Sequence, residues 1–297
     1  MGEYGWVVAS LLNTATVTAG PMVTPWLNHH AVGSGVIASY FVGTAVIALL
    51  VTILVTGRIQ IPEPWVLLAG MLFGAGVLSV QKATERSPEP AVAIAIPSSR
   101  AFLTSLLAFL VLGITTSFSL GLTYIVQLIL CVVLVVITHI YNQNDEPTPW
   151  SMYAVIATVL LSVSDIILKQ SGSFDTVFGD TSWFAISGSI IPLVMNYTKT
   201  GTFLPTFREK GTVDPAMWWT TLGIMVAVFY LRIVTQVLSI SLAPNPALPH
   251  IIGSFAVPAV AFLAWNSGRY RVTIQEIVVL ALITLTSLTS GYVAYQS

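Results

Sequence analysis

The sequence predicts an all-α integral membrane protein, and its composition and hydropathy carry that prediction. Of its 297 residues, 55% are hydrophobic and 8% are charged, and the mean hydropathy is +0.86. Soluble domains are typically about 25% charged, so these charges are too few to cover a water-facing surface of this size. Lipid offers no hydrogen-bond partners to an exposed backbone, so helices, which satisfy their own backbone groups, are the expected architecture.

Ten segments meet the requirement of about 20 mainly apolar residues for crossing a bilayer. The first lacks the basic start of a signal peptide, so we expect a retained helix. Pro21 and Pro25 within it predict a kink or an unwound stretch. Gly70 and Gly74 predict a close approach of the third helix to a neighbour. The ten predicted spans are residues 5–26, 32–56, 64–84, 91–112, 118–141, 150–170, 182–198, 216–241, 247–266 and 274–295.

The stretches between these spans are rich in residues that end helices or favour turns. "ERSPEPA" separates the third span from the fourth, and "LAPNPALP" separates the eighth from the ninth. The two longest connections are "SGSFDTVFGDT", residues 171–181, and "KTGTFLPTFREKGTVDPA", residues 199–216. These two connections flank the seventh span and leave it short. Neither connection is long or polar enough to form a separate soluble domain.

The order of features repeats at an offset of about 155 residues, which lays Ser99 on Ser254. Each half contains a Gln-bearing helix, a Pro-containing turn, a helix with Pro and Ser, and a final apolar helix. Ten spans give five in each repeat, and an odd number places the second copy in the opposite orientation across the membrane. Inverted repeats are typical of secondary transporters, with the substrate site near the midplane. We therefore expect a single membrane domain made of two inverted five-helix repeats, residues 1–145 and 146–297.

A family resemblance appears in the segment "WVLLAGMLFGAGVLSVQKATERSPEPAVAIAIPSSRAFLTSLLAFLVLG", residues 65–113. It contains a Gly-rich helix, a short turn, and a small-residue helix with a Pro that ends near Gly. This segment resembles the core of an EamA-type repeat of the drug/metabolite transporter superfamily, and residues 218–268 resemble a second copy. The resemblance implies that helices one to four and six to nine enclose a central cavity, with five and ten at the periphery. Gly113 is not followed by the Glu-Arg pair that many members have, which leaves the subfamily and the substrate open.

Three ionisable residues lie well within predicted spans: Arg100, Asp165 and Arg232. A charge at a helix centre costs about 2.5–3.5 kcal/mol on insertion scales, so it usually faces a wet cavity or an opposite charge. We interpret Arg100 and Arg232 as an anion-binding pair, and Asp165 as the partner of a substrate amine or a proton-linked carboxylate. Three alternatives stay open. Asp165 could pair with Lys169 one turn further on, Asp165 could neutralise an arginine, and Arg232 could extend to the membrane surface.

Seven further side chains complete the candidate substrate-binding set. Gln81 and its repeat counterpart Gln236 could bind a solute or join helices, a contact typically worth only ~0.6 kcal/mol. Asn13 lies on a polar stripe of the first helix, and Tyr40 could form an aromatic wall or belong to an interfacial belt. A neutral His250 near a helix start could be structural or relay protons. The seven are Asn13, Tyr40, Gln81, Ser99, Gln236, His250 and Ser254.

Several classes of function are disfavoured. The net charge of −1 offers no basic surface for nucleic acid. His29, His30 and His139 lack the convergent carboxylates or thiolates of a metal site, and the single cysteine, Cys131, excludes an internal disulfide. No nucleotide-binding glycine loop or nucleophile elbow indicates an ATP-driven pump or a hydrolase. We expect neither a cofactor nor enzymatic activity.

The remaining function is solute transport. We expect a secondary transporter that moves an amino acid or a related small polar metabolite by alternating access, driven by the solute's own gradient, protons or a counter-substrate. An exchanger of phosphorylated or nucleotide-linked metabolites is an alternative that two cavity arginines would suit. A non-transporting membrane scaffold or receptor is another, and a homodimer stays open.

Basic residues outside the two central arginines gather on one side. The positive-inside rule places both termini outside the cytoplasm, whereas the family resemblance implies cytoplasmic termini. We therefore expect only that the termini share a side. Arg58 and Lys169 lie on the side of the termini; the opposite side carries Lys82, Arg86, Lys199, Arg208, Lys210, Arg269 and Arg271.

Overall fold

The computed structural model of the protein describes residues 5–87, 90–141, 150–171, 176–207, 214–267 and 273–296. Within these residues the secondary structure consists of twelve α-helices and no strand. The expected repeat boundary at residues 145 and 146 lies outside the described residues, as do Arg208, Lys210, Arg269, Arg271 and the side chain of His139.

Nine segments of the described chain are long and apolar enough to cross a membrane, and α12 contains a shorter apolar stretch, Ile274–Thr289. Two of the nine combine a pair of helices, α4 with α5 and α10 with α11. The helices are α1 (Gly5–His30), α2 (Gly33–Thr56), α3 (Pro64–Arg86), α4 (Pro90–Ser98), α5 (Ala101–Leu112), α6 (Phe118–Tyr141), α7 (Trp150–Ser171), α8 (Val177–Thr200), α9 (Pro215–Leu242), α10 (Leu248–Gly253), α11 (Ala256–Asn266) and α12 (Ile274–Gln296).

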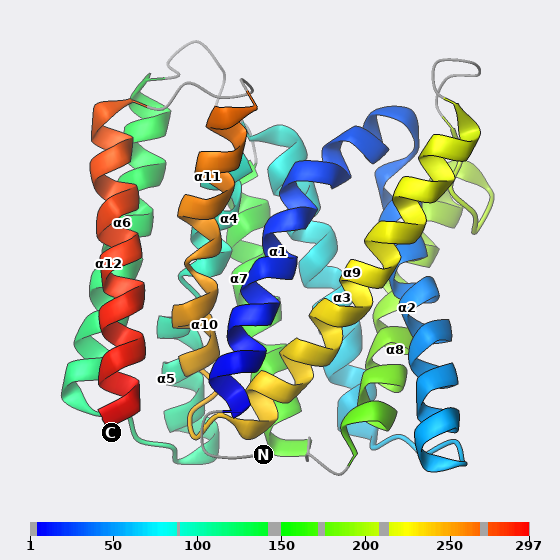
Figure 1. The fold of residues 1–297 in the computed structure, drawn as a ribbon, viewed down its shortest axis with the longest axis horizontal. Coiled ribbons are helices and arrows are strands. Elements are labelled where there is room, and N and C mark those ends of the chain that lie inside the picture. Colours follow the sequence, from blue (N-terminus) through cyan, green and yellow to red (C-terminus); the bar gives the residue numbers. More distant parts are fainter. Residues whose placement is uncertain are drawn as a thin grey trace.

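The helices form one bundle in which elements far apart in the sequence pack together (Figure 1). α3 packs against α7 and α8, α1 against α9, and α2 against α8. α6 and α12 lie side by side at one edge of the bundle. The start of α1 and the end of α12 lie at the same end of the molecule.

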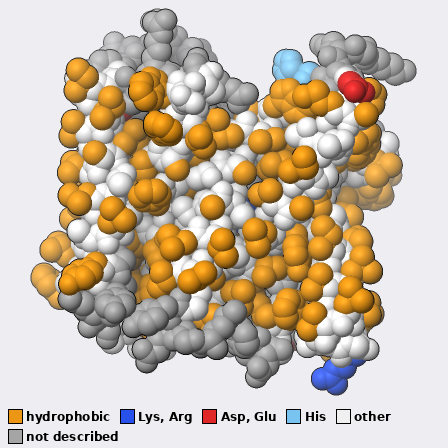
Figure 2. All heavy atoms as spheres, in the orientation of Figure 1, with side chains coloured by type: hydrophobic (Ala, Val, Ile, Leu, Met, Phe, Trp, Pro, Cys, Tyr) orange, Lys and Arg blue, Asp and Glu red, His pale blue; other side chains and the backbone are white. Residues whose placement is uncertain are grey.

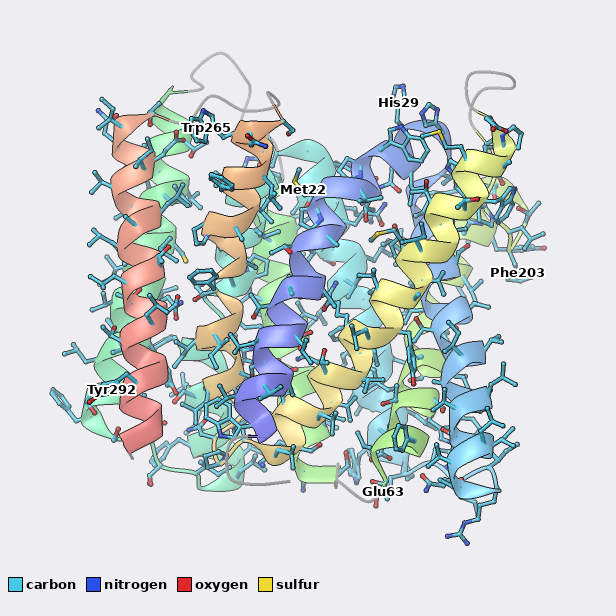
Figure 3. All side chains as sticks on the ribbon, viewed as in Figure 1. Met22, His29, Glu63, Phe203, Trp265 and Tyr292 are labelled. Atoms are coloured by element: carbon cyan, nitrogen blue, oxygen red, sulfur yellow. The ribbon has the colours of Figure 1, made fainter. Side chains whose placement is uncertain are left out.

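The outer surface has the character of a multi-pass membrane protein. Figure 2 shows hydrophobic side chains spread over the full length of the helices, with charged side chains visible only at the two ends. Glu63 and His29 mark these opposite ends in Figure 3. Helices that face lipid are expected to expose apolar side chains along their whole span, because the hydrocarbon around them is itself apolar.

Glycines allow α3 and α8 to approach closely, as the small-residue pair in α3 predicts. A Cβ atom on Gly74 would lie 2.8 Å from the backbone carbon of Gly188, and one on Gly70 would lie 3.0 Å from that of Phe184. Both distances are too short for a real contact with backbone atoms. The prediction of close packing at Gly70 and Gly74 is therefore confirmed.

Two predicted elements differ from the structure. α8 begins at Val177 and has 24 residues, so the seventh span is not short. The end of the connection "SGSFDTVFGDT" is therefore helical, and Asp180 lies in the first turn of α8, where a carboxylate is favourable. Of the two alternatives for the first helix, the structure has the kink: α1 stays helical through Pro21 and Pro25 and bends in its second half (Figure 1), as prolines within helices cause.

The predicted spans 91–112 and 247–266 are each broken. Arg100 lies between α4 and α5 with φ −61° and ψ −11°, and Phe255 lies between α10 and α11 with φ −59° and ψ −18°. Pro97 precedes the first break and Pro258 follows the second, and each removes a backbone donor from the helical ladder. Arg100 is therefore not in a regular helix but at a turn within the bundle.

Candidate solute-binding cavity

Asp165 on α7 is the centre of a buried polar network. Its Oδ2 lies 3.4 Å from Arg100 Nε and 2.8 Å from His250 Nε2. Its Oδ1 accepts a hydrogen bond from Gln236 Nε2 over 2.8 Å. Asn13 Nδ2 in turn donates to Gln236 Oε1 over 2.7 Å. The structure thus brings together five of the candidate residues from α1, α7, α9, α10 and the break before α5.

The geometry of this network fits a neutral histidine. Arg100 Nε donates to His250 Nδ1 over 3.2 Å, so this ring nitrogen must be the unprotonated one. The proton of a neutral imidazole then lies on Nε2, the nitrogen 2.8 Å from Asp165 Oδ2. Asp165 is 1% exposed and is neutralised by Arg100. Its oxygens face these partners, and Asp165 does not line either of the cavities described below.

Lys169 does not pair with Asp165, so that alternative is wrong. Lys169 Nζ instead donates to the backbone oxygens of Ser241 and Ala243, over 3.0 and 2.7 Å. These carbonyls belong to the C-terminal end of α9, whose last carbonyls lack helical donors and attract a cation. Lys169 therefore joins α7 to the end of α9.

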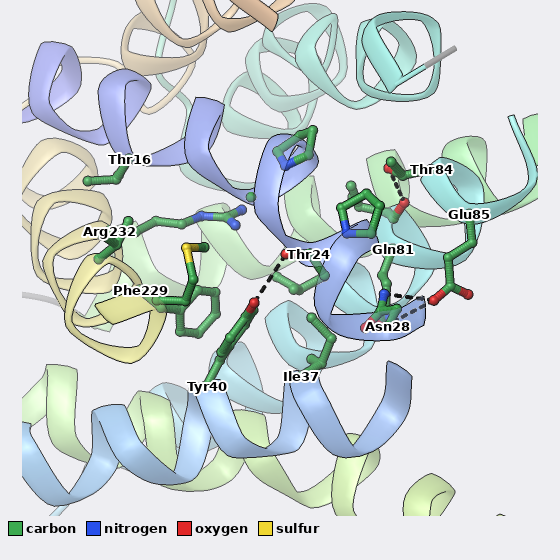
Figure 4. Close-up of a pocket in the computed structure, with 17 residues that line it drawn as sticks. Thr16, Thr24, Asn28, Ile37, Tyr40, Gln81, Thr84, Glu85, Phe229 and Arg232 are labelled. Carbon is green, nitrogen blue, oxygen red and sulfur yellow. Dashed lines mark hydrogen bonds between the residues drawn. The ribbon is translucent and has the colours of Figure 1, made fainter. Parts of the chain in front are cut away.

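Arg232 on α9 faces a cavity between α1, α2, α3 and α9 (Figure 4), whose empty space is about 600 Å³ with the open solvent at its mouth included. Among the described residues, no carboxylate lies within ion-pair distance of its guanidinium. Arg232 Cζ lies 5.7 Å from the ring centre of Phe73 and 5.5 Å from that of Phe229, distances at which aromatic rings attract cations. Arg232 points into the bundle, so the alternative that it extends to the membrane surface is wrong.

A second void of about 530 Å³ adjoins the first. Arg100, Gln236 and His250 line it, and Arg232 and Val80 line both voids. Arg232 therefore lies where the two voids meet, and the Asp165 network lies at the second void.

Two further candidate residues, Tyr40 and Gln81, line the larger cavity. The hydroxyl groups of Tyr40 and Thr24 are 3.2 Å apart. Gln81 Nε2 donates to Glu85 Oε1 over 2.9 Å, and Asn28 Nδ2 donates to the same oxygen over 2.8 Å. Asn28 and Glu85 were not among the predicted site residues, although the spacing of Gln81 and Glu85 places both on one face of α3.

Ser99 and Ser254 line neither cavity. Ser99 Oγ donates to the backbone oxygen of Ile96 over 2.7 Å. Ser254 Oγ lies 2.7 Å from Ser287 Oγ on α12 and contacts Gln127 on α6. Both serines lie at the helix breaks, where they hydrogen-bond to protein groups.

Comparison with known proteins bears on the fold alone. No family model matches the sequence, and no curated protein matches it. Among solved structures, 28 chains match the fold. One of them, titled "Crystal structure of protein", has a TM-score of 0.71 and 14% identity over 99% of this chain and 99% of that chain. At this identity the similarity establishes a shared fold for the full chain and says nothing about activity.

Proposed function

We propose that the protein is a secondary transporter of a small polar organic solute, similar to EamA-type transporters and working by alternating access. The observation that carries this proposal is Arg232, a cation without a carboxylate partner among the described residues, facing a cavity inside an apolar bundle. A charge in the membrane interior costs about 2.5–3.5 kcal/mol. Two aromatic rings offset part of this, and an anionic group of a solute would offset the rest.

The packing of the helices supports two inverted repeats. α1 to α6 and α7 to α12 follow the same order, and a break divides α4 from α5 and α10 from α11. In this order α1 corresponds to α7 and α3 to α9, so the contact of α3 with α7 corresponds to the contact of α9 with α1. The contacts of α2 with α8 and of α6 with α12 each join a helix to its own counterpart. This is the pattern that a two-fold axis between the halves produces. The shared end of α1 and α12 supports termini on one side of the membrane (Figure 1).

The difference between the two ends of the bundle supports alternating access. The larger cavity reaches the exposed Glu85, near the end of α3, and so opens at the end away from the termini. At the other end the Asp165 network joins the two halves through the ion pair of Arg100 with Asp165. Thr52 Oγ1 and Ser182 Oγ, 3.0 Å apart, join α2 to α8 there as well. In an alternating-access transporter these contacts would separate, and equivalent contacts would form at the opposite end.

The charges favour a carboxylate solute over a phosphorylated one. Arg100 is neutralised by Asp165, which leaves one unpaired guanidinium at the cavity. A single guanidinium matches one carboxylate in a bidentate pair, whereas a phosphate dianion would leave a charge without a partner. We therefore favour amino-acid-like solutes over the phosphate exchange that two free arginines would suit.

Flux measurements in proteoliposomes test the proposal. We expect saturable uptake of at least one carboxylate solute from a panel of amino acids, short peptides, sugar phosphates and nucleotide sugars. Arg232→Gln should reduce uptake by about 10- to 100-fold, as expected for a lost hydrogen-bonded charge. Arg58→Gln, which removes an exposed charge beyond α2, should leave it unchanged. Absence of saturable flux for every solute would favour a scaffold or receptor.

A further inference from the structure

The larger cavity is long and carries opposite charges at its two ends. Its α1 wall runs from Thr16 to Asn28, which spans at most roughly 18 Å because α1 bends within this stretch. Arg232 lies at the Thr16 end, because it also lines the neighbouring void together with Asn13. Glu85 lies at the Asn28 end, where Asn28 Nδ2 donates to its carboxylate over 2.8 Å. In Figure 4 the two charged side chains lie on opposite sides of the cavity.

Oxygen acceptors without partners surround Glu85. Asn28 and Gln81 use their amide nitrogens to donate to Glu85 Oε1. Their carbonyl oxygens, Asn28 Oδ1 and Gln81 Oε1, have no hydrogen-bond partner among the described residues, although the side chains are only 4% and 7% exposed. No basic side chain of the described chain forms an ion pair with Glu85. Buried acceptors of this kind call for a donor, and an ammonium group brings three donors and the opposite charge.

Gly33, the first residue of α2, leaves room for this cluster. A Cβ atom at Gly33 would overlap Gln81 Nε2 and lie 2.6 Å from Glu85 Oε1. The atoms in the way are the ends of flexible side chains, so a larger residue would displace the amide and the carboxylate rather than separate the helices. The glycine therefore preserves the arrangement of the polar groups.

The wall between the two charged ends is apolar and aromatic. Ile37 and Tyr40 contribute from α2, Val77 from α3, and Met225 and Phe229 from α9. Such a wall suits the apolar body of a ligand, with the few polar groups fixing its orientation.

We infer that the solute is an elongated zwitterion, with its amine held by Glu85, Asn28 and Gln81 and its carboxylate held by Arg232. This inference rests on the proposed function for the identity of the cavity as the solute site. We expect the two charges of the solute to lie on the order of 10 Å apart, because both side chains extend inward along a cavity at most roughly 18 Å long. An α-amino acid carries both charges on one carbon and cannot reach both ends.

Binding to the purified full-length protein, measured by calorimetry, tests the inference with four probes. 8-Aminooctanoate has both charges, its N-acetyl derivative lacks the amine charge, its methyl ester lacks the carboxylate, and 2-aminooctanoate carries both charges on one carbon. We expect 8-aminooctanoate to bind at least about 10-fold more tightly than the other three, as for lost charged hydrogen bonds. In Glu85→Gln its advantage over the N-acetyl derivative should vanish. In Arg232→Gln its advantage over the methyl ester should vanish, whereas Arg232→Lys should keep part of it.

Glu63→Gln is the matched control, because Glu63 is exposed at the start of α3, at the end of the molecule opposite the cavity mouth (Figure 3). It should keep the wild-type order of affinities. Equal binding of 2-aminooctanoate and 8-aminooctanoate, or an amine preference that survives Glu85→Gln, would overturn the inference and leave the proposed transport untouched. The inference would likewise be overturned, and transport retained, if no probe binds while another solute shows Arg232-dependent flux. Conversely, the expected binding pattern without flux of any solute would overturn the transport function and leave the ligand class standing.

Discussion

Arg100 and Arg232 both lie in apolar segments, and their surroundings give them different roles. Arg100 is 3.4 Å from Asp165 and donates to His250. Arg232 has two aromatic rings and a cavity around it. Breaking a buried ion pair leaves an uncompensated charge and typically costs about 3–5 kcal/mol. We therefore assign Arg100 and Asp165 to stability and closure, and Arg232 to solute binding.

The paired role of Arg100 and Asp165 predicts a strong coupling between them. Asp165→Asn and Arg100→Gln should each lower the free energy of unfolding by about 3–5 kcal/mol. The double variant should be more stable than the sum of the single changes predicts, because no lone charge remains. A double-mutant cycle of unfolding free energies in detergent measures this. Additive effects of the two substitutions would show that the pair is not coupled.

Lys169 provides a second prediction about a single side chain. Its two hydrogen bonds to the carbonyls of Ser241 and Ala243 satisfy the end of α9. Lys169→Met should lower the free energy of unfolding by about 1.5–3 kcal/mol, the range for a charged hydrogen bond. Thermal unfolding should show no such loss for Lys199→Met, since Lys199 is exposed at the end of α8. Equal effects of both substitutions would argue against a stabilising contact between Lys169 and the end of α9.

The helices show which features of the fold follow from local sequence. Apolar length and separating residues predict the order and approximate limits of the spans, because hydropathy acts on each segment alone. The breaks at Arg100 and Phe255 were not predicted. Pro97 and Pro258 weaken the helices locally, but the neighbouring helices and buried polar groups decide whether a break forms. The same holds for the site. Isolated charges mark Arg100, Asp165 and Arg232 as unusual, but only the packing decides which of them are paired.

The contact between α3 and α8 gives a prediction about helix packing. Gly74→Ala should lower the free energy of unfolding by about 1–3 kcal/mol, because the added carbon would meet the backbone of Gly188. Gly223→Ala on α9 is the matched control, because nothing lies within 4 Å of its added carbon. That change should leave stability equal or raise it by up to about 1 kcal/mol. Thermal unfolding of both variants checks the difference, and a neutral Gly74→Ala would contradict the close approach.

The proposed transporter is made of two inverted halves, and its larger cavity opens at the end away from the termini. Inverted halves have two equivalent ways of closing, one at each end of the bundle. The two halves are joined at the closed end by the Asp165 network and the Thr52–Ser182 contact. Because opening one end requires these contacts to separate, solute transport and exposure of the closed end should occur together.

Labelling of single cysteines in nanodiscs, with the buried Cys131 replaced by alanine, tests this coupling. Thr84→Cys reports on the open cavity and Ser182→Cys on the closed end, where Ser182 is 1% exposed. When the transported solute is added, the rate of modification by a charged maleimide should fall at Thr84→Cys and rise at Ser182→Cys. Protection of Thr84→Cys without any increase at Ser182→Cys would contradict alternating access, because the protein would then bind its ligand without opening the other end.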